Sequence, residues 1–364
     1  MKRFFKIATA ALAMGVAVTL AGCGGFTSCT SCSSCNSKSK NIALTNSNWY
    51  PGTGYKGIQP SFIDSTKEIL SYTVTHNGDG AKNNSYSVEY KEGSYKTKFY
   101  ATRQFNRANF NFPEGYNAPD NNNETVYCFE TEFSISVKYK LKSGTESDLL
   151  EDSIKTICYF RAAGKNLQPV YSERGCVTHV PANASAGSIE SAYREFKATY
   201  KNYYTYDCSH VTTVTQENGE INTDVRRLKT KNSLFDNEEL YIAVRSMKNS
   251  SGSQTVSLYI PADGGLVDRT IKASGAGIGD EERKSITDVL VQNGLYTRTE
   301  EGNNVPTVAA EIARTDGKGV TQTVWYAAIT NADNNVSRST MLKMTMPLSY
   351  GLGTLNFVLS KIGE

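Results

Sequence analysis

The chain has 364 residues, of which 39% are hydrophobic and 21% are charged, with 39 Lys and Arg against 36 Asp and Glu. The excess of three positive charges lies in the first six residues, at Lys2, Arg3 and Lys6, so residues 23–364 carry 36 basic and 36 acidic side chains. A neutral chain lacks the electrostatic attraction that nucleic acid binding requires, and we therefore exclude nucleic acid as a partner.

The first 22 residues have the pattern of an export signal. Positive charges precede an uncharged run at residues 7–20, which is too short to cross a bilayer of about 30 Å as a helix. The sequence Leu-Ala-Gly at residues 20–22 then stands directly before Cys23, and this ending resembles the lipobox of bacterial lipoproteins. The alternative is an ordinary secretory signal in which Cys23 is incidental.

The lipobox resemblance implies both a modification and a location. Cys23 would carry a diacylglyceryl group on its sulfur, and the chain would be cut before it. The protein would then be exported and anchored on the outer face of the cytoplasmic membrane, or on the outer membrane if the host has one. Its first partner is therefore the membrane, through the N-terminal lipid.

Residues 23–47 are predicted to form a flexible tether. They are rich in Ser, Thr, Asn and Lys and show neither a strand period nor a helix period. A flexible chain of this length reaches about 25 to 30 Å. Cys29, Cys32 and Cys35 have the spacing of metal ligands, but no fourth ligand lies nearby, so we assign them to the tether.

Residues 48–186 are predicted to be an N-terminal β region. The 22 tyrosines of the chain and its short alternating apolar runs favour strands over helices. Turn residues at 77–80 and 91–93 predict hairpins, because Asn, Asp and Gly accept positive φ. Strands are predicted at residues 70–76, 85–90, 95–105, 126–141, 155–161 and 170–180.

Residues 187–364 are predicted to be a C-terminal β region with two helices. At residues 188–203 apolar side chains recur every three or four positions, and at residues 280–293 they do so between Asp280 as cap and Gly294 as stop. A strand, turn and strand over residues 239–260 resemble a later stretch at 324–346, which fits either duplication or an ordinary meander. The predicted fold class is mainly β, with antiparallel meander sheets arranged as a sandwich or half-barrel and two short packed helices.

Few residues offer chemistry. The chain has three histidines and no motif typical of hydrolases, kinases or phosphate-binding loops. Cys176 and His179 precede the first predicted helix and Cys208 and His210 follow it, so these four could bind zinc if the flanking strands met. The two cysteines could equally form a disulfide, or neither arrangement could apply.

Two further features remain open from the sequence. Cys128 and Cys158 lie in predicted strands, either as small buried hydrophobes or as a cross-strand disulfide. Five tyrosines gather around the end of the first predicted helix and could form a binding patch or half-buried sheet. They are Tyr193, Tyr200, Tyr203, Tyr204 and Tyr206.

The sequence therefore predicts a lipid-anchored envelope protein without a catalytic residue, a metal site or a cofactor. The favoured function is a non-enzymatic binding or structural module whose partner is a glycan, a protein or an apolar ligand. One alternative is a carrier that holds a lipid in a concave sheet, and another is a hydrolase. The binding module and the carrier can be distinguished by structure. A carrier needs a continuous apolar hollow, whereas a surface binder needs an exposed platform.

Overall fold

The strands follow one another along the chain and pair in nearly the same order. The computed structural model describes residues 67–78, 85–102, 126–163, 166–181, 186–236, 238–245, 252–263, 265–300, 302–316, 321–331, 336–338, 340–348 and 352–363. The signal, Cys23 and the tether lie outside the described residues.

The first half of the described chain contributes eight strands. They are β1 (Glu68–Asn77), β2 (Tyr86–Thr102), β3 (Val126–Leu141), β4 (Leu150–Ala163), β5 (Asn166–Pro181), β6 (Tyr193–Tyr204), β7 (His210–Glu217) and β8 (Glu220–Arg227). Each pairs antiparallel with the next, so β1 to β8 form a meander.

The second half contributes the remaining strands and both helices. The elements are β9 (Ser233–Asp236), α1 (Glu239–Val244), β10 (Ser253–Ile260), β11 (Gly265–Ser274), α2 (Asp280–Gln292), β12 (Thr307–Arg314), β13 (Gln322–Ala327), β14 (Ile329–Asn331), β15 (Val336–Arg338), β16 (Met341–Pro347) and β17 (Thr354–Ile362). Strands β14 and β15 form a separate pair, and Pro261–Asp263 forms a short 3-10 turn.

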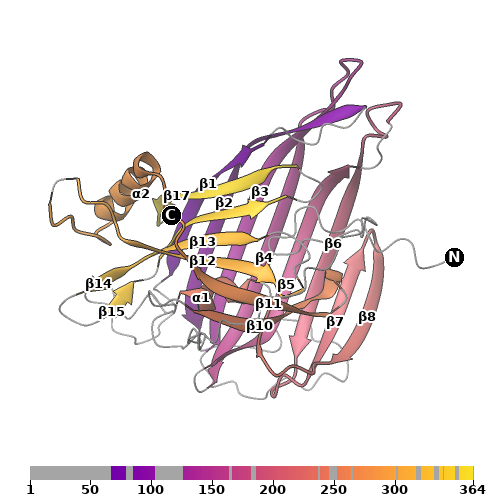
Figure 1. Ribbon diagram of the computed structural model, residues 1–364. Coiled ribbons are helices and arrows are strands. Elements are labelled where there is room, and N and C mark those ends of the chain that lie inside the picture. The colour runs from indigo at the N-terminus through magenta and orange to yellow at the C-terminus, as the bar shows by residue number, and fades with distance from the viewer. Residues whose placement is uncertain are drawn as a thin grey trace, which may run out of the picture.

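The two halves join into one sheet because β17 pairs with β1. The resulting order of fifteen strands is β8-β7-β6-β5-β4-β3-β2-β1-β17-β16-β13-β12-β11-β10-β9. All neighbours are antiparallel except β9 and β10. The sheet curls back on itself, so that β9 at one end packs against β5 (Figure 1). The predicted class, mainly β with antiparallel meanders, is confirmed.

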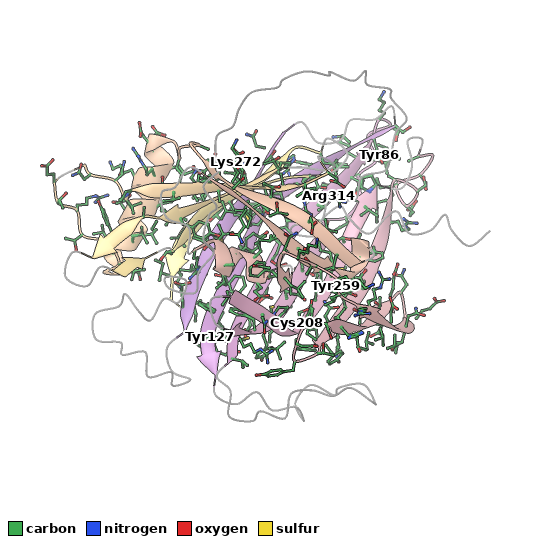
Figure 2. The ribbon with its side chains drawn as sticks, turned by 60° about the horizontal axis from the view of Figure 1, so that its bottom comes forward. Tyr86, Tyr127, Cys208, Tyr259, Lys272 and Arg314 are labelled. Atoms are coloured by element: carbon green, nitrogen blue, oxygen red, sulfur yellow. The ribbon has the colours of Figure 1, made fainter. Side chains whose placement is uncertain are left out.

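Helix α1 lies inside the curled sheet. All six of its residues are buried, and the five after Glu239 belong to one core cluster with residues of both halves. The Tyr241 hydroxyl accepts a hydrogen bond from Gln322 of β13, and the Tyr326 hydroxyl donates to the carbonyl of Tyr241. Side chains fill the space between the two parts of the sheet (Figure 2). The concave face is therefore a packed core.

The helix predicted at residues 188–203 is wrong, because residues 193–204 form β6. The pattern misleads because Phe196, Ala198, Tyr200 and Tyr204 also fit a strand period of two, and all four are buried. β6 pairs along its length with β5 on one side and β7 on the other. Backbone hydrogen bonds to both neighbours stabilise the segment as a strand and not as a helix.

The second predicted helix is confirmed as α2 at residues 280–292. Two other predictions are wrong. The strand predicted at residues 239–244 is α1, and because all six residues are buried, their sequence has no polar face to reveal the helical period. The turn predicted at residues 91–93 is a bulge within β2, where the register with β3 shifts between Tyr90 and Gly93.

Among the described residues, neither helix has the length and apolar character needed to cross a membrane.

The bulge predicts a cost for adding one methyl group. A Cβ at Gly93 would lie 2.4 Å from the carbonyl oxygen of Ser134, whereas a Cβ at Gly175 would meet only Thr199 Oγ1, at 3.9 Å. We expect Gly93→Ala to lower the free energy of unfolding by about 2 kcal/mol or more, and Gly175→Ala to change it by less than about 1 kcal/mol. Urea denaturation measures both, and equal losses would contradict this account of the bulge.

Candidate functional site

A buried polar cluster connects α1 to the inner face of the sheet. Asp236, at the end of β9, accepts hydrogen bonds on Oδ2 from Ser172 at 2.6 Å, Asn202 at 3.3 Å and Tyr204 at 2.6 Å. These donors lie on β5 and β6, so the cluster fixes the end of β9 against the first half of the sheet. With three donors on one oxygen, the Asp236 carboxylate is well satisfied in spite of its burial.

Two more carboxylates follow directly, at Glu238 and Glu239, and both are fully buried. Glu238 Oε1 accepts a hydrogen bond from Thr156 at 3.4 Å and lies 3.8 Å from Arg174 Nη1. Glu239 Oε2 accepts a hydrogen bond from the Asp236 amide at 3.1 Å. The second oxygen of each glutamate has no hydrogen-bond partner.

Burial sets the protonation of this pair. It raises the pKa of Glu238 to about 7, although the nearby Arg174 opposes the shift, and it holds the pKa of Glu239 well above its ordinary range. A protonated carboxyl is the state that a dry interior favours. Within the part of the chain that the structure describes, no group of three His, Cys, Asp or Glu side chains is arranged to hold a metal ion. The cluster is therefore a device that holds α1 in place.

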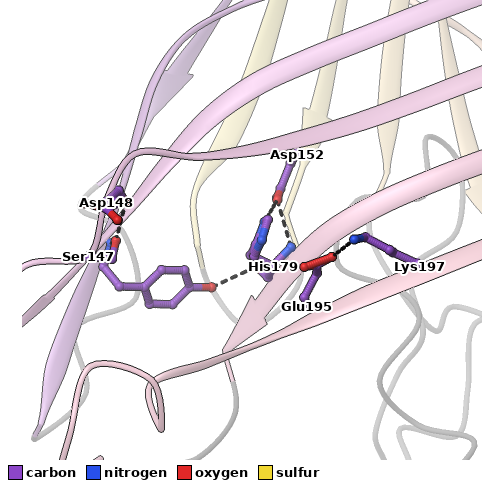
Figure 3. Close-up of polar contacts among 7 residues, drawn as sticks. Ser147, Asp148, Asp152, His179, Glu195 and Lys197 are labelled. Carbon is purple, nitrogen blue, oxygen red and sulfur yellow. Dashed lines mark hydrogen bonds and ion pairs between the residues drawn. The ribbon is translucent and has the colours of Figure 1, made fainter. Parts of the chain in front are cut away.

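The only buried ion pair between a histidine and a carboxylate in the described residues joins His179 on β5 and Asp152 on β4 (Figure 3). Asp152 Oδ1 lies 2.8 Å from both the amide nitrogen and Nδ1 of His179, and the Tyr139 hydroxyl donates to the His179 carbonyl. Burial raises the pKa of Asp152, and its hydrogen bonds to His179 oppose the shift.

His179 and Asp152 have the geometry of a catalytic base and the acid that orients it. Among the described residues, however, no serine hydroxyl is hydrogen-bonded to His179 as a nucleophile would be. The Ser147 hydroxyl donates to the carbonyl of Asp148 and accepts a hydrogen bond from the Tyr139 amide. Figure 3 shows Ser147 well apart from His179 and Asp152. The arrangement explains how the ends of β3, β4 and β5 are held together, and it gives no support to acyl-transfer chemistry.

The four residues considered for zinc do not come together. Cys176 pairs with Ala198 and His179 with Glu195 of β6, whereas Cys208 and His210 lie beyond the end of this strand. Because β6 is a strand, Tyr204 at its end lies about 20 Å along the strand from the level of Cys176 and about 30 Å from the level of His179. A helix would have shortened these distances by about half.

All four described cysteines are free thiols: Cys128, Cys158, Cys176 and Cys208. Cys158 lies opposite Phe129 and Cys128 opposite Tyr159, so the two neighbouring thiols project from opposite faces of the sheet. Cys208, which is labelled in Figure 2, lies in the turn after β6 with a positive φ of 53°. Its thiol contacts the carbonyl of Pro169.

Of the two alternatives for the five tyrosines, the structure favours sheet over an exposed binding patch. On a strand, the tyrosines of β6 alternate between the two faces, and Tyr200, Tyr203 and Tyr204 are buried. Of the five, only Tyr206 is largely exposed, and the Arg161 guanidinium lies over its ring at 3.6 Å from the ring centre.

The outer face of β4 to β7 carries a groove that sequence analysis missed. Lys155, Gly175, Thr199 and Gln216 are directly paired across the four strands, on the face opposite the buried Ile154. Gly175 leaves this row without a side chain at its centre. We call the resulting hollow of about 720 Å³ the outer groove. Its lining consists of Ser153, Lys155, Gly175, Cys176, Val177, Lys197, Ala198, Thr199, Gln216, Asn218 and Gly219.

Six of the eleven residues that line the outer groove have hydrogen-bonding side chains, while the surface of the hollow as a whole is more apolar than polar. Lys155 and Lys197 are exposed, and each pairs with a glutamate on its own face, Lys155 with Glu132 at 2.7 Å and Lys197 with Glu195. Hydroxyl and amide groups come from Ser153, Thr199, Gln216 and Asn218. Such a hollow offers donors and acceptors, and the positive charge of its two lysines is balanced by the glutamates beside it.

Comparison with known proteins gives little further information. No family model and no curated protein matches the chain. Among solved structures, the chain is similar to the crystal structure of a beta-barrel-like protein of domain of unknown function DUF1849 from Brucella abortus. The identity is 11%, the TM-score is 0.43, and the match covers 82% of this chain and 98% of that one.

The buried glutamate predicts a pH-dependent stability. The pKa of Glu238 is about 7 in the folded protein against an ordinary 4.5, so the folded state binds this proton more tightly than the unfolded state does. The contribution of this protonated carboxyl to the free energy of unfolding is full below pH 4.5 and is lost as the pH rises through 7. Relative to Glu238→Gln, the free energy of unfolding of the wild type should therefore fall by up to about 3 kcal/mol between these values.

Urea denaturation at a series of pH values tests this expectation. Glu146→Gln is the matched control, because Lys138 and Lys140 hold the pKa of this exposed carboxyl at about 2, outside the window. Its curve should run parallel to that of the wild type. A Glu238→Gln curve that is also parallel would show that Glu238 titrates normally.

Proposed function

We propose that the protein is a non-enzymatic binding module of the bacterial cell envelope, anchored through lipid on Cys23, that binds a glycan in the outer groove. The observation that carries the proposal is the occupation of the concave face by α1, which leaves the outer face of β4 to β7 for a ligand. The groove is floored by the bare backbone of Gly175 and surrounded by hydroxyl, amide and ammonium groups. These groups suit a hydroxyl-rich polymer.

The carrier of an apolar ligand is the weaker alternative. Such a carrier needs an apolar hollow on the concave side of the sheet. In this protein that side holds a six-residue helix and three buried carboxylates, at Asp236, Glu238 and Glu239. Admission of a lipid would require α1 to leave a core that its own burial stabilises.

Filling the groove tests the glycan site. Gly175→Leu places a side chain over the groove floor at a strand position with open space, so the fold should persist. Binding to a microarray of bacterial and plant polysaccharides should fall by about tenfold or more, since the ligand loses access to the floor. Thr75→Leu is the control, because it adds the same side chain at an exposed position on β1, which three strands separate from β5.

Two outcomes would contradict the glycan proposal. One is the absence of binding to every printed polysaccharide by the wild-type protein. The other is wild-type binding by Gly175→Leu, which would place the ligand elsewhere.

The lipid anchor is tested separately in the producing bacterium. Cells fed an alkyne-labelled fatty acid should label the wild-type protein, and Cys23→Ser should abolish the label, since the sulfur that carries the lipid is lost. Cys29→Ser, six residues away in the tether, should keep it. Retention of the label by Cys23→Ser would place the lipid on another residue.

A further inference from the structure

The two ends of the sheet differ in how their free edges are treated. At one end, Leu234, Phe235 and Asp236 of β9 are buried, and the strand packs against β5. At the other end, β8 is exposed along nearly its whole length and pairs only with β7 among the described strands (Figure 1). An exposed edge offers a row of backbone donors and acceptors to another strand.

Strand β8 lacks several devices that block edge pairing, although four of its eight residues are charged. It is eight residues long, contains neither Pro nor Lys, and pairs with β7 in continuous register. Four large hydrophobic side chains are exposed in the described chain, and two of them, Ile221 at 67% and Val225 at 65%, lie on the same face of β8. These features are typical of a strand that has a partner.

The turn before β8 fixes which backbone groups face the free edge. Asn218 and Gly219 form a two-residue turn with φ of 47° and 91°, so Glu217 and Glu220 form the closing hydrogen-bonded pair. Backbone bonds alternate along an antiparallel pair, so the N–H and C=O groups of Ile221, Thr223 and Val225 point away from β7. These three residues are therefore available to a partner strand.

We propose that β8 pairs antiparallel with β8 of a second copy of this chain, on a two-fold axis that passes beside Thr223. This register places Ile221 opposite the partner's Val225 and Thr223 opposite the partner's Thr223. It also places Glu220 opposite the partner's Arg226, and Asn222 opposite the partner's Asp224. About six backbone hydrogen bonds form, and each cross-strand pair is favourable.

Charge complementarity selects this register over its neighbours. A two-fold axis normal to the sheet pairs residues of the same face, so the centre must fall on a residue. Centring on Asn222 would place Glu220 opposite Asp224, and centring on Asp224 would place that carboxylate opposite itself. Because like charges directly opposite each other are destabilising, the centre at Thr223 is preferred to both of these neighbouring centres. Arg226 already forms an ion pair with Asp224 of its own strand, and the partner's Glu220 joins that pair.

Exchange of charges tests the pairing. The mature chain with Cys23→Ser should dimerise in sedimentation velocity, and Glu220→Lys or Arg226→Glu alone should weaken dimerisation by about tenfold or more. An equal mixture of these two variants should recover the dimer, since every charged pair between them is then opposite in sign. Recovery distinguishes lost complementarity from damage to the fold.

Cysteine cross-linking tests the register. In a chain whose tether cysteines, Cys29, Cys32 and Cys35, are serine, Thr223→Cys should form a disulfide-linked dimer under mild oxidation, because the two Cα atoms lie about 5.5 Å apart. Ile221→Cys is the control, since its two copies lie about 14 Å apart. A wild-type chain that stays monomeric across the concentration series, or equal cross-linking of both variants, would overturn the proposal.

Discussion

The closure of the sheet over helix α1 is the constraint on which the rest of the fold depends. A helix of six residues is too short to be stable alone, since nucleation is costly and few bonds repay it. Here it is held by contacts from both halves of the sheet: Glu238 with Thr156 on β4, Tyr241 with Gln322 on β13, and Arg245 with Glu68 on β1. The sheet in turn needs the helix, because its concave face would otherwise expose a large apolar surface.

The same closure determines where the protein can meet a ligand. Since the interior is packed, contact with other molecules is left to the outer face and to the sheet edges. The outer groove exists because one strand position, Gly175, has no side chain, whereas its neighbours Lys155 and Thr199 do. Asp236 and Glu238, which lie next to α1, are on the opposite face of the sheet. The surface proposed to bind a glycan is thus separated from these two buried residues.

The fold class could be predicted from local patterns, and the sites could not. Alternation in residues 126–141 and the cap and stop around residues 280–292 are local signals, and both elements formed as expected. The segment 188–203 fits both periods, and only its pairing with β5 and β7 decides for a strand. In the same way, no local feature of Glu239–Val244 reveals that the segment will be surrounded by sheet.

The zinc site and the tyrosine patch, which the sequence left open as alternatives, fail for a common reason. Both were considered around a helix between Cys176 and Cys208, and the segment is the strand β6 instead. The outer groove had no signal in the sequence, because it arises from the register of four strands. A glycine within a strand was the one local hint, and it gains meaning only when its neighbours across the sheet are known.

The pairing of β1 with β17 has a consequence for the order of folding. Leu70 lies beside Ile362, so the sheet is continuous only when nearly the whole chain is present. Contacts of such long sequence separation form slowly, and chain synthesis delivers β17 last. The meander β1 to β8 can begin earlier, but the edge of β1 stays open and α1 has no closed interior to enter. The closed sheet is therefore absent until β17 has been made, and such an incomplete fold would suit the export proposed for this protein.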